Sequence, residues 1–236
     1  MGNVVFITQA RMGSTRLPGK VMKSVNGFPI LYWFLKRSFK ANYVNKWVVA
    51  TSVNFQNDPL ADFVKDHFPD CHVTRGSESD LLSRYKQAAE ETDADVIVRV
   101  TSDCPFLDWA LMDDCISRFL SDKCDALRTL RSNFPIGLDV EIFSRDCLEK
   151  ADREAEKPEE REHVGPYVFN NPDVFNICWL ANQGEVWPEC RLTLDYQEDL
   201  DLIKILYSRV GPLSEANDFR KYLNDHPEIA RINLKR

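Results

Sequence analysis

The sequence predicts an α/β protein with a mostly parallel sheet, and three observations lead to this prediction. Short apolar runs rich in β-branched residues alternate with amphipathic stretches from the N-terminus to about residue 127. The apolar runs are nearly continuous, as in strands that are buried on both faces. The chain has 236 residues, 44% of them hydrophobic, which is enough to bury a full core.

The first half of the chain carries the regular alternation. We expect strands at residues 4–8, 47–51, 71–74 and 96–100, and helices at 28–40, 59–67, 80–90 and 109–120. Helices between parallel strands cover both faces of the sheet, which gives three layers. In such a sheet, ligands bind beyond the carboxyl ends of the strands.

The alternation loosens in the second half of the chain. We expect strands at residues 139–143, 174–180 and 191–194, and helices from 145, at 198–209 and at 218–223. Residues 1–236 are interpreted as a single domain, in which residues 128–190 form a small insertion that carries acceptor-binding or oligomer contacts.

Charge and composition exclude several classes of protein. There are 30 basic and 37 acidic residues, and the net charge of -7 opposes nonspecific binding to nucleic acid or to an anionic membrane. No apolar run approaches ~18 residues and no basic leader precedes the first strand, so we expect a cytoplasmic protein. The seven cysteines are an odd number without a CxxC pair, which argues against a disulfide framework and against a zinc site. We expect them to be small buried apolar residues.

The loop after the first strand is the most informative segment. It reads QARMGSTRLPGK and combines three cations with three small turn-forming residues: Arg11, Arg16 and Lys20 with Gly13, Ser14 and Gly19. Glycines let backbone N–H groups approach phosphate oxygens, and the cations neutralise a triphosphate. It is not a Walker A loop, because Val21 stands where a Ser or Thr would hold magnesium. An ordinary surface turn is the alternative, but so many cations at one strand end are unusual in an acidic protein.

Two aspartates are placed to hold a divalent cation. Asp103 follows the strand expected at 96–100, and Asp195 follows the strand expected at 191–194. Transfer chemistry on a nucleoside triphosphate needs such a cation, and magnesium prefers oxygen ligands. Each aspartate could instead be a helix N-cap, although Pro105 delays the next helix after Asp103.

The segment RMGSTRLPGK, followed by an apolar helix, resembles the signature of the cytidylyltransferases that activate sugars for surface polysaccharides. These include the synthetases of CMP-ketodeoxyoctonate and CMP-sialic acid and a spore coat polysaccharide branch, which the chain resembles most. The resemblance runs from Gln9 to Leu202 and implies a three-layer nucleotide-diphospho-sugar transferase fold of Rossmann-like type. It also implies a magnesium-dependent nucleotidyltransferase that moves CMP from CTP to a sugar or sugar-acid acceptor and releases pyrophosphate.

The resemblance also implies roles for individual residues. Nucleotide binding is assigned to Ala10, Arg11, Met12, Gly13, Ser14, Arg16, Lys20, Arg75, Asp80, Arg84 and Thr101. Catalysis is assigned to Arg16, Lys20 and Asp103, and magnesium binding to Asp103 and Asp195. The match is imperfect, because Ser102 replaces a usual Gly and Thr101 stands where the ketodeoxyoctonate branch has a base-recognising Gln.

Two further segments resemble the acceptor pocket of the spore-coat branch. They are GLDVEIFS at 137–144 and EREHVGPYV at 160–168, and they assign acceptor binding to Asp139, Glu141, Glu162 and His163. A solvated strand face explains Asp139 and Glu141 equally well, because they alternate with apolar residues. The carboxylate of a sugar acid needs a cation or N–H donors, and the candidates are His163, Arg161 and Arg131.

Other functions remain open at this point. A sugar 1-phosphate nucleotidyltransferase that uses another NTP, a glycosyltransferase that consumes a nucleotide sugar, and a nucleotide-binding module without turnover would all use a similar phosphate loop. Release of pyrophosphate from NTP and acceptor separates them. The expected partners are CTP or another NTP and a sugar acceptor, with neither nucleic acid nor membrane, and a homodimer is compatible with the resemblance.

Overall fold

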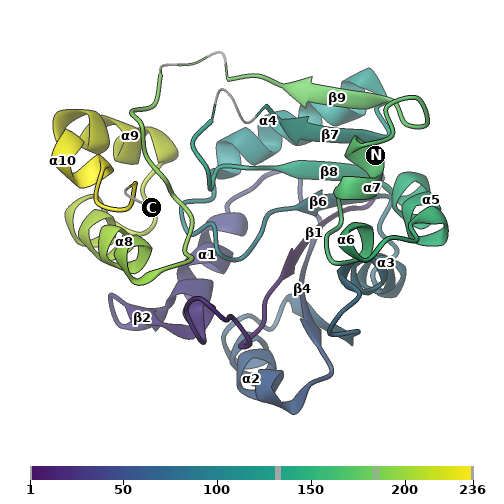
Figure 1. Cartoon of the computed structure of the whole chain (residues 1–236), viewed down its shortest axis with the longest axis horizontal. Helices are drawn as coiled ribbons and strands as arrows, with labels where there is room; N and C mark the ends of the chain where they lie inside the picture. Colours follow the sequence, from purple (N-terminus) through teal and green to yellow (C-terminus); the bar gives the residue numbers. More distant parts are fainter. Residues whose placement is uncertain (1, 131–133, 183, 185, 235–236) are drawn as a thin grey trace.

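The computed structural model describes residues 2–130, 134–182, 184 and 186–234, and a seven-stranded sheet lies at its centre (Figure 1). The strand order is β5-β4-β1-β6-β8-β7-β9. The strands are β1 (Val4–Gln9), β4 (Lys46–Ser52), β5 (Cys71–Gly76), β6 (Val96–Arg99), β7 (Ala126–Thr129), β8 (Glu141–Ser144) and β9 (Ile177–Leu180). Only β8 runs antiparallel to its neighbours in this sheet, so the predicted mostly parallel sheet is confirmed.

Helices cover both faces of the sheet. The helices are α1 (Ile30–Ser38), α2 (Asp58–His67), α3 (Leu81–Glu91), α4 (Trp109–Asp122), α5 (Arg145–Glu154), α6 (Pro158–Arg161), α7 (Pro166–Phe169), α8 (Gln197–Arg209), α9 (Ala216–Asp225) and α10 (Pro227–Ala230), with the 3-10 turns η1 (Lys20–Met22) and η2 (Phe55–Asn57). Helices α1, α2 and α4 pack on one face, and α3, α5 and α7 on the other. In Figure 1, α8, α9 and α10 gather at one side of the sheet, where they bury a third apolar cluster with α1. None of the described helices is long and apolar enough to cross a membrane.

Two short elements differ from the prediction. The helix expected from residue 28 begins at Ile30, because β3 (Phe28–Pro29) pairs with β2 (Ser24–Val25) in a hairpin. The turn between them is Asn26-Gly27, both with positive φ, and Asn-Gly is the strongest short-range signal for a hairpin. Strand β7 was not expected, because Arg128 interrupts its apolar run.

The prediction of a strand at residues 191–194 is wrong. This segment bends at residue 193 and makes only an isolated bridge between Ile136 and Arg191 among the described residues. Gly137 has φ of 106°, and a Cβ there would collide with the Leu192 carbonyl. Glycine therefore lets the two segments touch, and the Leu194 N–H donates to the Asp103 carbonyl at 2.7 Å. This contact places Asp195 beside the end of β6.

The residues predicted as an insertion, 128–190, share the central sheet, because they contribute β8 and β9.

The prediction for the cysteines holds only in part. Cys71, Cys104, Cys115, Cys147 and Cys190 are free and buried, as expected. Cys124 and Cys178 form a disulfide, contrary to expectation. Their separation of 54 residues gives no local signal, and the bond joins the start of β7 to β9.

Arg37 of α1 ties three parts of the chain together from a fully buried position. Its guanidinium donates to the backbone carbonyls of Leu107 (2.7 Å), Phe106 (3.4 Å), Pro212 (3.0 Å) and Ser214 (2.7 Å). Burial lowers the pKa of Arg37 to about 10. The side chain thereby holds the loop after Asp103 and the chain entering α9 against α1.

We expect Arg37→Met to lower the free energy of unfolding by about 3 kcal/mol or more, because several buried carbonyls lose their donor. Lys36→Met is the matched control, since Lys36 is the exposed neighbour in the same helix. Chemical denaturation of both variants measures the difference. Equal stability of the two variants would show that Arg37 does not hold these segments.

Candidate functional site

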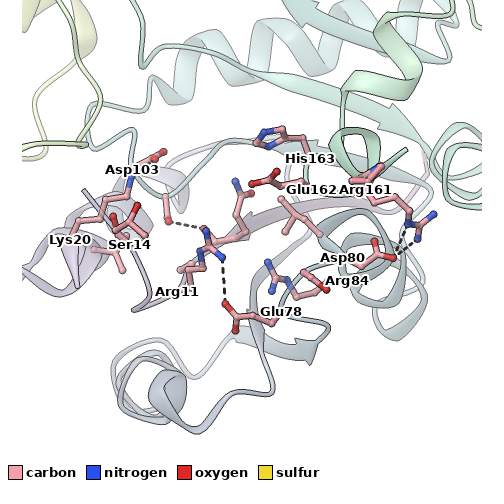
Figure 2. Close-up of a pocket in the computed structure, with 18 of the residues that line it drawn as sticks. Arg11, Ser14, Lys20, Glu78, Asp80, Arg84, Asp103, Arg161, Glu162 and His163 are labelled. Carbon is pink, nitrogen blue, oxygen red and sulfur yellow. Dashed lines mark hydrogen bonds and ion pairs between the residues drawn. The ribbon is translucent and has the colours of Figure 1, made fainter. Parts of the chain in front are cut away.

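A cleft of about 920 Å³ opens beyond the carboxyl ends of β1 and β6. Its walls are the loop after β1, the N-terminal end of α3, and the segment 156–163 around α6 (Figure 2). The predicted site residues that line it are Ala10, Arg11, Ser14, Arg16, Lys20, Asp80, Arg84, Asp103, Glu162 and His163. The structure thus brings the phosphate loop, the α3 end and part of the predicted acceptor segment into one cavity.

The phosphate loop is held by its own backbone. The Met12 carbonyl accepts from the N–H groups of Ser14 (2.9 Å) and Gly19 (3.1 Å), and the Met12 N–H donates to the Asn57 side chain at 2.8 Å. Gly19 adopts the left-handed conformation that starts η1, which carries Lys20. Because these hydrogen bonds fix the turn, they also fix the backbone positions from which its basic side chains extend.

The ammonium of Lys20 bridges the two predicted metal-binding aspartates. Its Nζ lies 2.6 Å from Asp103 Oδ2 and 3.0 Å from Asp195 Oδ1. Burial alone would lower the pKa of Lys20, but the two carboxylates outweigh burial and the pKa is raised. We refer to this arrangement of Lys20, Asp103 and Asp195 as the lysine bridge.

Asp195 is surrounded by cations. Arg16 NH2 lies 2.6 Å from its Oδ1, and Arg191 pairs with its Oδ2. Burial would raise the pKa of Asp195, but Lys20, Arg16 and Arg191 together lower it. Asp195 is therefore ionised and held in place by three basic side chains.

The sequence analysis missed Asp199, which fixes the Asp195 backbone. Asp199 Oδ2 accepts from the N–H groups of Asp195 and Tyr196, both at 2.8 Å, and its Oδ1 accepts from Asn233 at 2.8 Å. Asp199 stands at the third residue of α8, the position of an acidic capping residue. An acidic residue at the third position of a helix was the sequence signal that could have identified Asp199.

The two aspartates fit a magnesium ion. They are hard oxygen donors that the fold brings together beside the phosphate loop. Magnesium in proteins is commonly held by one or two carboxylates, with substrate phosphates and water as the other ligands. Asp103 and Asp195 could take this role once Lys20 turns to a phosphate.

The α3 end of the cleft combines a capped helix with a buried cation. Asp80 Oδ1 accepts from the Ser83 N–H at 2.9 Å. Arg84 is buried, and its NH1 donates to the Ser77 carbonyl at 2.8 Å. Its Nε has no partner in the described part of the chain, and burial lowers the pKa of Arg84.

Arg161 joins α6 to the α3 end of the cleft. Its Nε donates to Asp80 Oδ2 at 2.7 Å, and its NH2 pairs with Asp152 at 2.6 Å. Arg161 is thus already bound by two carboxylates, which argues against its suggested contact with an acceptor carboxylate. Arg131 lies outside the described residues. Glu162 and His163 follow Arg161 and project toward the cleft (Figure 2).

The remaining predicted nucleotide contacts do not line the cleft, and their roles stay predictions. Met12 and Gly13 belong to the phosphate loop. Arg75 is bonded to Asp58 and to the carbonyls of residues 52 and 54. Thr101 Oγ1 lies 3.1 Å from Cys104 Sγ.

Two predicted acceptor residues also lie outside the lining. Asp139 Oδ2 accepts from the Gly137 N–H at 3.3 Å. Glu141 is only 8% exposed, so a solvated strand face does not explain it. Its carboxylate pairs with Arg99 of β6 and lies 3.6 Å from Arg128 NH2 of β7.

Comparison with known proteins supports a relationship over the whole domain. A sequence model of the cytidylyltransferase family matches residues 5–219. The chain is 34% identical to spore coat polysaccharide biosynthesis protein SpsF of Bacillus subtilis (strain 168), and the alignment covers 98% of each protein. The structure of a cytidylyltransferase from Leptospira borgpetersenii serovar Hardjo-bovis is similar with a TM-score of 0.91 at 33% identity, over 98% of this chain and 97% of that one.

A more distant structure shows the shared fold. It is CMP:2-keto-3-deoxy-manno-octonic acid synthetase in complex with CTP, with a TM-score of 0.66 at 17% identity, over 87% of this chain and 98% of that one. The family model and the relationship to SpsF both span nearly all of the sequence. The chain therefore belongs to the cytidylyltransferase family and is a nucleotidyltransferase.

Proposed function

We propose that this protein transfers CMP from CTP to a sugar acid and releases pyrophosphate. The observation that carries the proposal is the lysine bridge beside the phosphate loop, which gathers a cation and two carboxylates at one edge of the sheet. Membership of the family supports CTP as the donor. The sugar acid is supported by 30% identity, over 129 residues, to the 3-deoxy-manno-octulosonate cytidylyltransferase of Geobacter metallireducens.

The chemistry requires one displacement at phosphorus. An acceptor hydroxyl oxygen attacks the α-phosphorus of CTP, the bond from that phosphorus to the pyrophosphate oxygen breaks, and the hydroxyl proton passes to water. Magnesium, bound by Asp103 and Asp195, would neutralise charge on the triphosphate. Arg16 and Lys20 stabilise the negative charge of the departing pyrophosphate through charge-assisted hydrogen bonds. Positioning and electrostatics then supply most of the rate, without a covalent intermediate.

Binding of CTP exchanges one set of ion pairs for another. In the unliganded protein, Arg16 and Lys20 neutralise the two aspartates. Triphosphate oxygens can take over the cations, and Asp103 and Asp195 would then be free to hold magnesium.

The acceptor is assigned to the wall formed by segment 156–163. Glu162 and His163 line the cleft there and face it across from the phosphate loop. A carboxylate such as Glu162 can accept hydrogen bonds from sugar hydroxyls, and His163 can donate to an oxygen of the acceptor. The roles of both residues in acceptor binding remain part of the proposal.

We expect CTP with magnesium to protect the protein against thermal unfolding more than ATP, GTP or UTP at equal concentration. A ligand that binds only the native state at 100 times its Kd stabilises it by about 2.7 kcal/mol. Thermal shift with each nucleotide, with and without magnesium, measures the preference. Equal protection by all four nucleotides would contradict the cytidine specificity.

We expect Arg16→Ala and Asp103→Asn to separate phosphate binding from metal chemistry. Arg16→Ala should weaken CTP binding about 10- to 100-fold, because a charge-assisted contact is lost. Asp103→Asn should fold normally and lower kcat by a factor of about 100 or more while changing CTP affinity much less. Calorimetric titration and pyrophosphate release measure the two effects. Arg118→Ala, which removes a surface ion pair on α4, is the control.

Wild-type turnover in Asp103→Asn would show that Asp103 is not part of the reaction. Unchanged CTP affinity in Arg16→Ala would show that Arg16 serves only to hold Asp195.

A further inference from the structure

Gln9, the last residue of β1, presents a fixed hydrogen-bond donor to the cleft. It lines the cavity, and its Oε1 accepts from the hydroxyl of Tyr85. Its own carbonyl accepts from Ser102 Oγ at 2.6 Å, which fixes the backbone. Its Nε2 has no hydrogen-bond partner among the residues that the structure describes. Two N–H groups of a held amide therefore remain for a ligand.

A buried tyrosine sets the direction of this amide. Tyr85 of α3 is fully buried, and its hydroxyl lies within hydrogen-bond distance of the Ile7 carbonyl (3.1 Å) and of Gln9 Oε1. Both neighbours are acceptors for the hydroxyl, so Gln9 presents its oxygen to Tyr85 and directs its Nε2 away from it. The Gln9 amide is thus oriented by Tyr85, and its donor is left at the cleft.

Gln9 lines the same cleft as the wall assigned to the acceptor. Glu162 and His163 of that wall and the phosphate loop that follows Gln9 border one cavity with it. A ligand that fills the cavity can therefore reach Gln9 and the acceptor wall together.

A sugar acid places a carboxylate in this region, and most cations of the cleft are already paired. Arg16 and Lys20 bind the aspartates or the triphosphate, and Arg161 is bound by Asp80 and Asp152. A carboxylate that enters the cleft near β1 needs N–H donors instead. Gln9 offers them without adding a charge.

We infer that Gln9 Nε2 donates to the carboxylate of the acceptor sugar acid, and that Tyr85 is a positioning residue for this contact. The inference rests on the proposed function, because it presumes a sugar-acid acceptor.

The test compares Gln9→Leu, Gln9→Glu and Tyr85→Phe with Gln56→Leu, a control at an exposed glutamine outside the cleft. The probes are 2-keto-3-deoxy sugar acids, beginning with 2-keto-3-deoxy-manno-octonic acid, and kinetics use the acid that wild type converts fastest. Steady-state pyrophosphate release gives kcat and KM for that acid, and calorimetry gives the Kd of CTP.

We expect Gln9→Leu to raise the acceptor KM about tenfold or more, with the Kd of CTP within about twofold of wild type. Gln9→Glu should be worse than Gln9→Leu, because its carboxylate repels that of the acceptor. Tyr85→Phe should raise the acceptor KM by a smaller factor, because the amide loses its orientation but keeps its donors.

Two results would overturn the inference and leave the proposed function intact. The first is a wild-type acceptor KM in Gln9→Leu. The second is a wild-type acceptor KM in Gln9→Glu, because a carboxylate at residue 9 could accept a hydrogen bond from a hydroxyl but would repel the carboxylate of an acid. A rise in the Kd of CTP equal to the rise in acceptor KM would also overturn it and place Gln9 on the nucleotide. Failure of wild type to convert any sugar acid with CTP would instead overturn the proposed function, and the inference with it.

Discussion

The site is organised by the ion pairs of Lys20 with Asp103 and Asp195. Two carboxylates that share a partly buried position repel each other, and a cation between them removes this repulsion. The three residues come from the end of β6, the start of α8 and the loop after β1, so their approach depends on the whole fold. Gly137 and Asp199 also help to hold Asp195 beside Lys20, because they fix the chain on either side of Asp195.

The same ion pairs explain how an acidic protein can bind a triphosphate. The net charge of -7 disfavours a polyanion, but the cations of the cleft are concentrated at one strand end and are neutralised there by aspartates. Under the proposed function, a nucleotide that arrives with magnesium would bring both charges needed to replace these pairs.

The sequence predicted the parts of the site that are local in the chain. The phosphate loop and Asp103 follow strands whose apolar runs are clear, so their position at the sheet edge could be inferred. Asp195 was predicted at the correct edge of the sheet, but on the basis of a strand that does not form. Its segment is held instead by single contacts to residues 136 and 103. The Asn26-Gly27 dipeptide is a local signal for the β2–β3 hairpin, which the sequence prediction did not include.

Other features arise only from contacts distant in sequence. Arg128 fits β7 because its guanidinium stacks on Phe169, 4.6 Å from the ring centroid, and the disulfide joins cysteines far apart in the chain. The orientation of Gln9 depends on Tyr85 of α3, which is distant from it in the sequence. The most direct test of this site is a crystal structure with magnesium and a non-hydrolysable CTP analogue. We expect Lys20 Nζ to leave both aspartates for a phosphate oxygen while Asp103 and Asp195 bind the metal. A triphosphate bound elsewhere, with Lys20 still between the two carboxylates, would contradict it.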